Sequence, residues 1–132
     1  MKIKLSRKQG RIPITILHLE GDLALDGEGA LVAAAQQAYQ QGARHILLDM
    51  TAVPYVSSSG LRALHQVWMR LRDDQSPEEA EGIKAGIIAN TYKSPTLKLL
   101  NPSKAALKVL NISGYDMFLE IHHNLEEAVA SF

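Results

Sequence analysis

The chain has 132 residues, 46% of them hydrophobic and 5% aromatic, and Lys plus Arg equals Asp plus Glu at 14 each. This length fits a single domain, residues 1–132, with a core of Leu, Ile, Val and Ala. The zero net charge gives no indication of binding to nucleic acid or to an anionic membrane, and the lack of cysteine excludes disulfides and thiolate metal sites. The first 20 residues contain no long apolar run, so we expect no signal peptide, no membrane insertion and a cytoplasmic location.

The first half of the chain predicts two strands, a helix, a strand and a helix. Alternating residues indicate two strands within the first 20 residues, joined by a turn at Gly10. Asp26 is a candidate N-cap for an alanine-rich helix that stops at Gly42. The apolar run at 46–48 predicts a strand buried on both faces, as in a parallel sheet. A second helix then runs to about Arg72, with apolar residues at three- and four-residue spacing: Leu61, Leu64, Trp68 and Leu71.

The second half predicts an extra short helix and then strand, helix, strand, helix. Ser76, with Pro77 and Glu79 after it, forms a capping box for an extra helix at about 77–92. Its three isoleucines either pack on the domain or form a dimer contact: Ile83, Ile87 and Ile88. A strand is expected at 95–100, followed by a helix that begins at Asn101 or Ser103 and ends at Gly114. A strand at 117–122 and a helix capped by Asn124 and Glu127 complete the chain.

The stretch PYVSSSGLRAL, Pro54 to Leu64, places three hydroxyls immediately before the second helix. A helix cap, a nucleophile and a phosphorylation site are the three uses to consider. None of the five histidines stands in a spacing typical of a catalytic triad, and no Gly-x-Ser-x-Gly elbow is present, so we expect no enzyme activity. His122 and His123 are adjacent on a strand and point to opposite faces, so we expect no metal site and no cofactor.

Three segments resemble STAS domains, in particular the bacterial anti-sigma factor antagonists. They are LEGDLAL, HILLDMTAVPYVSSSGLRAL and LKLLNPSKAALKVLNISGYDMFLEI. The resemblance covers most of the chain and leaves residues 76–93 as an insert. It implies an α/β, STAS-like single domain with a mixed sheet of about five strands and helices packed mainly on one side.

The resemblance also implies a phosphorylation switch at Ser58. Its environment consists of Ser57, Ser59, Gly60 and the remaining acid Asp49. Ser57 stands where the family usually has Asp, and Ala24 stands where many members place an acid. A helix N-terminus accommodates either a capping hydroxyl or a phosphate, because its backbone amides are unpaired and its dipole is positive there.

The polar face of the second helix is a candidate docking surface. It carries Arg62, His65, Gln66, Met69 and Arg72 in a row, and methionine adapts to different partners. The resemblance implies an anti-sigma factor with serine kinase activity as the partner, and a PP2C-type phosphatase that restores the binding form. The alternative is a STAS scaffold or transport-associated subunit that is not phosphorylated and assembles a larger complex.

Overall fold

The computed structural model describes residues 1–72 and 93–132, so the expected helix at 77–92, with its isoleucines, lies outside the described residues. The strands are β1 (Lys2–Gln9), β2 (Pro13–Glu20), β3 (Ile46–Ala52), β4 (Leu97–Leu100) and β5 (Ile121–His122). The helices are α1 (Leu25–Gln40), α2 (Ser58–Arg72), α4 (Lys104–Ser113), the 3-10 turn η1 (Tyr115–Met117) and α5 (Leu125–Ala130). Within the described residues, no helix is long and apolar enough to cross a membrane.

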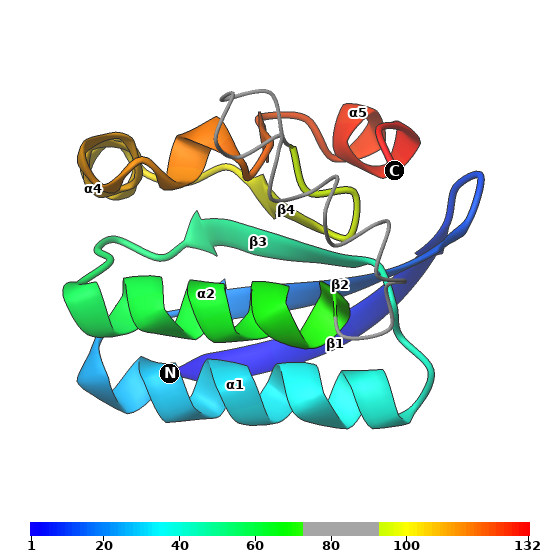
Figure 1. Cartoon of the computed structure of the whole chain (residues 1–132), viewed down its shortest axis with the longest axis horizontal. Coiled ribbons are helices and arrows are strands. Elements are labelled where there is room, and N and C mark those ends of the chain that lie inside the picture. The colour runs from blue at the N-terminus through cyan, green and yellow to red at the C-terminus, as the bar shows by residue number, and fades with distance from the viewer. Residues whose placement is uncertain (73–92) are drawn as a thin grey trace.

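The strands form one mixed sheet in the order β1-β2-β3-β4-β5 (Figure 1). β1 and β2 pair antiparallel as a hairpin that turns at Gly10, and the other three pairings are parallel. The sheet is therefore the mixed, five-stranded one that the sequence predicts. Because β3 alternates its side chains between two covered faces, its residues 46–48 are all buried.

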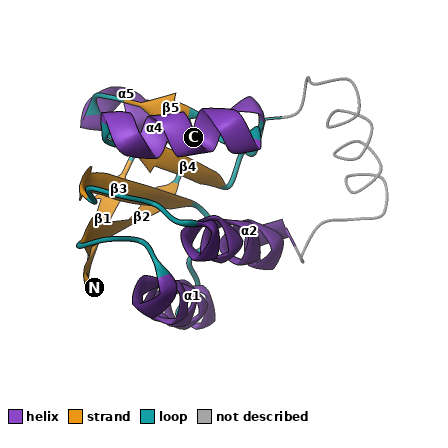
Figure 2. Ribbon diagram, turned by 90° about the vertical axis from the view of Figure 1, so that its left-hand side faces the viewer, coloured by secondary structure: helices purple, strands orange, loops and turns teal. Residues whose placement is uncertain are grey.

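The larger core lies between the sheet and the helices α1, α2 and α4. Buried leucine, isoleucine and valine side chains of β2, β3 and β4 meet the apolar side of α2 there. Ala35 and Ala38 of α1 are also buried, and their small side chains suit the close approach of this helix to the sheet. Figure 2 shows α1 and α2 together on one side of the sheet.

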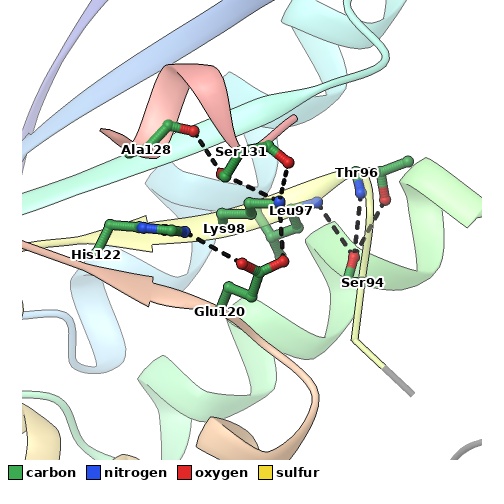
Figure 3. Close-up of polar contacts among 8 residues, drawn as sticks. All are labelled: Ser94, Thr96, Leu97, Lys98, Glu120, His122, Ala128 and Ser131. Atoms are coloured by element: carbon green, nitrogen blue, oxygen red, sulfur yellow. Dashed lines mark hydrogen bonds and ion pairs between the residues drawn. The ribbon is translucent and has the colours of Figure 1, made fainter. Parts of the chain in front are cut away.

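A smaller core lies on the opposite face of the sheet, under α5. Ile14, Ile16, Leu47 and Leu100 pack there with Ala128 of α5. Beside them the Lys98 ammonium, whose side chain is 3% exposed, forms an ion pair with Glu120 at 2.9 Å. It also donates to the Ser131 carbonyl at 2.7 Å, which attaches the end of the chain to β4 (Figure 3).

The prediction that Asp26 caps the first helix is wrong. The N-cap of α1 is Ala24, which makes no side-chain cap hydrogen bond, and Asp26 lies in the first turn. The start of α1 follows from Leu23, which is fully buried and whose backbone pairs with Tyr55 and Ser57. Tertiary anchoring of the preceding residue therefore fixes where this helix begins.

The last strand is shorter than the predicted 117–122. The chain forms η1 after Gly114, which ends α4 with a left-handed φ of 81°, and β5 contains only Ile121 and His122. Phe118 is half-buried against the core and packs on Trp68, with ring centroids 5.1 Å apart. Aromatic packing against α2 thus replaces strand pairing in this segment.

The other helix ends agree with their sequence signals. α1 is followed by Gly42, which has a φ of 104°, and α2 is helical from Ser58 to Arg72, where the first described range ends. Ser103, rather than Asn101, is the N-cap of α4, and its side chain accepts from Ala106. Asn124 caps α5 by accepting from the Glu127 amide at 3.0 Å.

Candidate functional site

The three serines lie at the edge of the sheet where the parallel strands end. α1 and α2 both begin on that side of the molecule, at the left of Figure 1. The segment that follows β4 reaches the same edge, because the Ser103 hydroxyl donates to the Pro54 carbonyl at 3.0 Å. Ligands of open α/β sheets commonly bind beyond the carboxyl ends of the strands, so this edge is a suitable place for a binding site.

Backbone hydrogen bonds fix the segment that leads into α2. Leu23 donates to the Tyr55 carbonyl at 2.9 Å, and Ser57 donates to the Leu23 carbonyl at 3.0 Å. Val56 is fully buried between these contacts. The first turn of α2 is therefore held against the segment that precedes α1.

Gly60 allows this close approach. A Cβ atom at this position would lie 2.2 Å from the Leu23 carbonyl oxygen and 3.0 Å from carbons of Leu23 and Val56. Real Cβ atoms do not approach a backbone oxygen so closely. The glycine of the Ser-Ser-Gly pattern is thus required by packing, independently of any role in modification.

The three serines differ in their surroundings. The Ser57 hydroxyl accepts a hydrogen bond from the Gly60 amide at 3.4 Å, so Ser57 is the cap of α2. The Ser59 hydroxyl accepts from the Arg62 guanidinium at 3.1 Å. Ser58 is exposed, whereas Ser57 and Ser59 are half-buried. The capping role expected of this run therefore belongs to Ser57 rather than to Ser58.

An ion pair joins this turn to α1. Arg62 Nε lies 3.3 Å from Glu28 Oε1, and the Arg62 side chain is 61% exposed. The sequence places Arg62 on the polar face of the second helix, but it gives no sign of Glu28, because that contact depends on how α1 packs beside α2. Glu28 and Ser59 therefore hold the Arg62 guanidinium beside the first turn of α2.

The row of polar residues on α2 faces outward, as the helical spacing predicts. Arg62, His65, Gln66 and Met69 are all exposed. Arg72 stacks on Trp68 and places Nη1 3.8 Å from Met69 Sδ. Two exposed apolar side chains that sequence reasoning missed lie in the segments before Ser58 and at the start of α1: Tyr55 is 48% exposed and Leu25 is 73% exposed. Their exposure follows from the tertiary position of these segments and has no periodic signal.

Asp49 lies apart from the three serines. Its neighbours Leu48 and Met50 point into the core under the helices, so Asp49 points to the opposite face of the sheet. Its carboxylate binds His18 Nδ1 at 2.8 Å and the Thr51 hydroxyl at 2.6 Å. The expectation that Asp49 belongs to the environment of Ser58 is therefore wrong, because the alternation of side chains along β3 directs it elsewhere.

The hydrogen bonds of Asp49 keep it ionised. Partial burial alone would raise the pKa of the Asp49 carboxyl, but hydrogen bonds from Thr51 and His18 outweigh burial and lower that pKa. A Ser6 hydroxyl on β1 continues this chain of contacts, 2.7 Å from His18 Nε2. The face of the sheet opposite α2 thus carries a polar network that sequence spacing does not indicate.

The two adjacent histidines at the end of β5 have different surroundings. His122 Nε2 lies 3.3 Å from Glu120 Oε1, and His123 is exposed. In residues 1–72 and 93–132, no group of three or more His, Cys, Asp or Glu side chains is arranged to hold a metal ion.

The sequence identifies the family. The family model described as MlaB, STAS domain matches residues 13–89, which is more than half of the chain. The chain therefore belongs to the STAS domain family. The match begins at β2 and includes the serine run and α2.

Solved structures of anti-sigma factor antagonists share this fold. One from Mycobacterium paratuberculosis has a TM-score of 0.68 at 13% identity and covers 98% of this chain and 93% of its own. Unphosphorylated SpoIIAA has a TM-score of 0.64 at 23% identity and covers 97% of this chain and 93% of its own. Phosphorylated SpoIIAA from Bacillus has a TM-score of 0.59 at 22% identity and covers 97% of this chain and 96% of its own. No curated protein matches the sequence.

Proposed function

We propose that this STAS domain is a cytoplasmic anti-sigma factor antagonist that binds an anti-sigma factor with serine kinase activity. Binding frees a sigma factor, and phosphorylation of Ser58 by the bound kinase releases the complex. A PP2C-type phosphatase restores the binding form. The domain acts in this exchange through binding rather than through catalysis.

The observation that carries the proposal is the exposed Ser58 hydroxyl at the first residue of α2. Its two neighbours are engaged, one as the cap of the helix and the other with Arg62. A kinase thus has access to Ser58 without unfolding the turn. Arg62, His65, Gln66 and Met69 extend from this point as an exposed row along α2, which is the docking surface that we propose.

The position of Ser58 also accounts for how a phosphate would act. A phosphoserine adds about 1.5 to 2 negative charges, and at the start of α2 the free amides and helix dipole favour such a charge. Facing an acidic group of a partner at about 4 Å, each unit of charge costs up to about 4 kcal/mol at an effective dielectric of 20. Because about 1.4 kcal/mol corresponds to a tenfold change in affinity, one phosphate suffices to release a partner without disturbing the fold.

A second candidate is a STAS scaffold or transport-associated subunit that is not phosphorylated. The neutral cap Ser57 favours it, because the family usually has an acid at this position. In this case the same α2 surface assembles a larger complex, and the serine run serves the helix alone.

Binding measurements on two variants separate these candidates. We expect Ser58→Asp to weaken binding to an anti-sigma factor with serine kinase activity by at least about tenfold. Ser58→Asn is the matched control, since it has the same size without the charge, and it retains most of the affinity. Equal affinity of the two variants contradicts the switch. Binding of both variants to a neighbouring membrane permease instead, with no binding to the kinase, supports the scaffold.

A further inference from the structure

Three side chains on the face of the sheet opposite α2 are hydrogen-bonded in the order Ser, His, Asp. The Ser6 hydroxyl of β1 lies 2.7 Å from His18 Nε2 of β2. His18 Nδ1 lies 2.8 Å from Asp49 Oδ2 of β3. Triads are recognised by this geometry rather than by sequence order or fold.

The arrangement fixes the role of each imidazole nitrogen. An ionised carboxylate only accepts hydrogen bonds, so neutral His18 carries its proton on Nδ1 and donates it to Asp49. The lone pair of Nε2 then faces the Ser6 hydroxyl, which donates to it. A general base that activates a serine needs this tautomer.

A second shell of contacts holds the carboxylate in place. The other oxygen of Asp49 accepts from the Thr51 amide at 3.1 Å and from the Thr51 hydroxyl at 2.6 Å. Asn101, at the end of β4, donates to the same hydroxyl at 3.3 Å. Neighbouring strands therefore position Asp49, and through it His18.

The site is open to solutes. The side chains of His18 and Asp49 are 38% and 20% exposed. Lys4 and Lys8 stand two positions before and after Ser6, on the same face of β1, and both are exposed. Their positive charges favour an oxyanion that forms beside Ser6.

We propose that Ser6 is a nucleophile, activated by His18 and positioned through Asp49, that accepts acyl groups from small activated esters. Ser6 Oγ forms a bond to the carbonyl carbon while its proton passes to His18 Nε2. The ester bond then breaks, and the leaving alcohol takes that proton. Water attacks the acyl-serine in the same manner, with His18 as base, and releases the acid. This site is independent of the proposed function of α2.

The test uses p-nitrophenyl acetate with the full chain. We expect intact mass to gain one acetyl group, and peptide mapping to place it on Ser6. Ser6→Ala abolishes this label, and His18→Gln slows it by about 100-fold, the usual scale of general-base catalysis. Ser113→Ala is the control, because Ser113 is another exposed serine, and it leaves the Ser6 label unchanged.

The pH dependence of the Ser6 labelling rate distinguishes a nucleophilic role of the network from a purely structural one. Only neutral imidazole accepts the serine proton, so the labelling rate of the unmodified sequence falls in acid. The charged groups around His18 are Asp49 on β3, Lys4 opposite it on β1, and Glu20 two residues further along β2. Asp49→Asn lowers the rate and shifts this profile. Acetylation confined to lysines, a Ser6 rate that does not fall in acid, or equal rates in folded His18→Gln would each overturn the proposal.

Discussion

The Ser57 hydroxyl accepts a hydrogen bond from the Gly60 amide, whereas the Ser58 hydroxyl is exposed one residue further along α2. Two identical side chains therefore have different roles, because the hydroxyl of the residue before the helix accepts from the amide three residues later, as an N-cap does. Gly60 completes this turn by allowing α2 to touch Leu23. At this scale one serine of the run caps a helix and the next offers an exposed hydroxyl.

Replacing Ser57 tests the capping role. We expect Ser57→Ala to lower the free energy of unfolding by about 0.5 to 1 kcal/mol, because the Gly60 amide loses its acceptor. Urea unfolding followed by circular dichroism measures this difference. Ser58→Ala is the matched control and changes stability by less than about 0.5 kcal/mol. A larger loss of stability in Ser58→Ala than in Ser57→Ala would show that Ser58, and not Ser57, caps the helix.

Replacing Gly60 tests the close contact between α2 and the segment before α1. Gly60→Ala forces the Leu23 backbone to move, and we expect a cost of about 1 to 3 kcal/mol from overpacking. Gly29→Ala is the control, because Gly29 lies in α1 with nothing within 4 Å of an added Cβ. That variant gains stability, by about 0.5 to 1 kcal/mol, from helix propensity. Similar thermal midpoints for the two variants would contradict the packing argument.

At the scale of elements, α5 and β5 are attached to the sheet by a charged contact within an otherwise apolar layer. Lys98 joins β4 to Glu120 and to Ser131 at the end of α5. Partial burial alone would raise the pKa of Glu120, but the hydrogen bond and charge of Lys98, helped by His122, lower it. The stability of this side of the domain therefore depends on pH.

The sign of that dependence follows from the lowered pKa. The unfolded chain binds a proton at Glu120 more readily than the folded one, so this contribution is complete above about pH 4.5 and is lost as pH falls through the folded pKa. We expect Glu120→Gln to be less stable at pH 7 and to show a weaker loss between pH 5 and 3. Urea midpoints at several pH values measure both effects.

The exposed Glu126→Gln provides the control for this experiment and keeps the acid dependence. In every variant, the lowered pKa of Asp49 also makes the free energy of unfolding rise with pH. His45 does so too, because burial, and then the charge of Lys98, lower its pKa. An unchanged slope in Glu120→Gln would show that its contact with Lys98 does not contribute.

Local signals predicted most elements, and long-range contacts explain the exceptions. The spacing of apolar residues predicted α2, and Gly42 and Gly114 predicted the ends of α1 and α4. These features depend on residues that are close in sequence. The start of α1 depends on Leu23, which is buried in the core, and the short β5 depends on Phe118, which packs on Trp68. The contact of Ser6 with His18 depends on the hairpin register, in which Lys4 faces His18, and thus on a turn whose length is not readable from spacing alone.

At the scale of the whole molecule, the fold brings the segments before α1, α2 and α4 to one edge of the sheet. This edge presents Ser58 at the start of the exposed row of α2, while the Ser6 network occupies the opposite face of the sheet. The pattern at Ser58 could be read from sequence, because family resemblance and helix spacing are both local. The contact of Arg62 with Glu28 needed the packing of two helices.

The most direct test of the proposed switch is phosphorylation itself. The protein is incubated with ATP and a purified anti-sigma factor that has serine kinase activity. The phosphate is mapped by mass spectrometry, and the affinity of the purified phosphorylated form is measured by calorimetry. We predict one phosphate, on Ser58, and at least about tenfold weaker binding. An unmodified Ser58, together with unchanged binding of Ser58→Asp, would contradict the account.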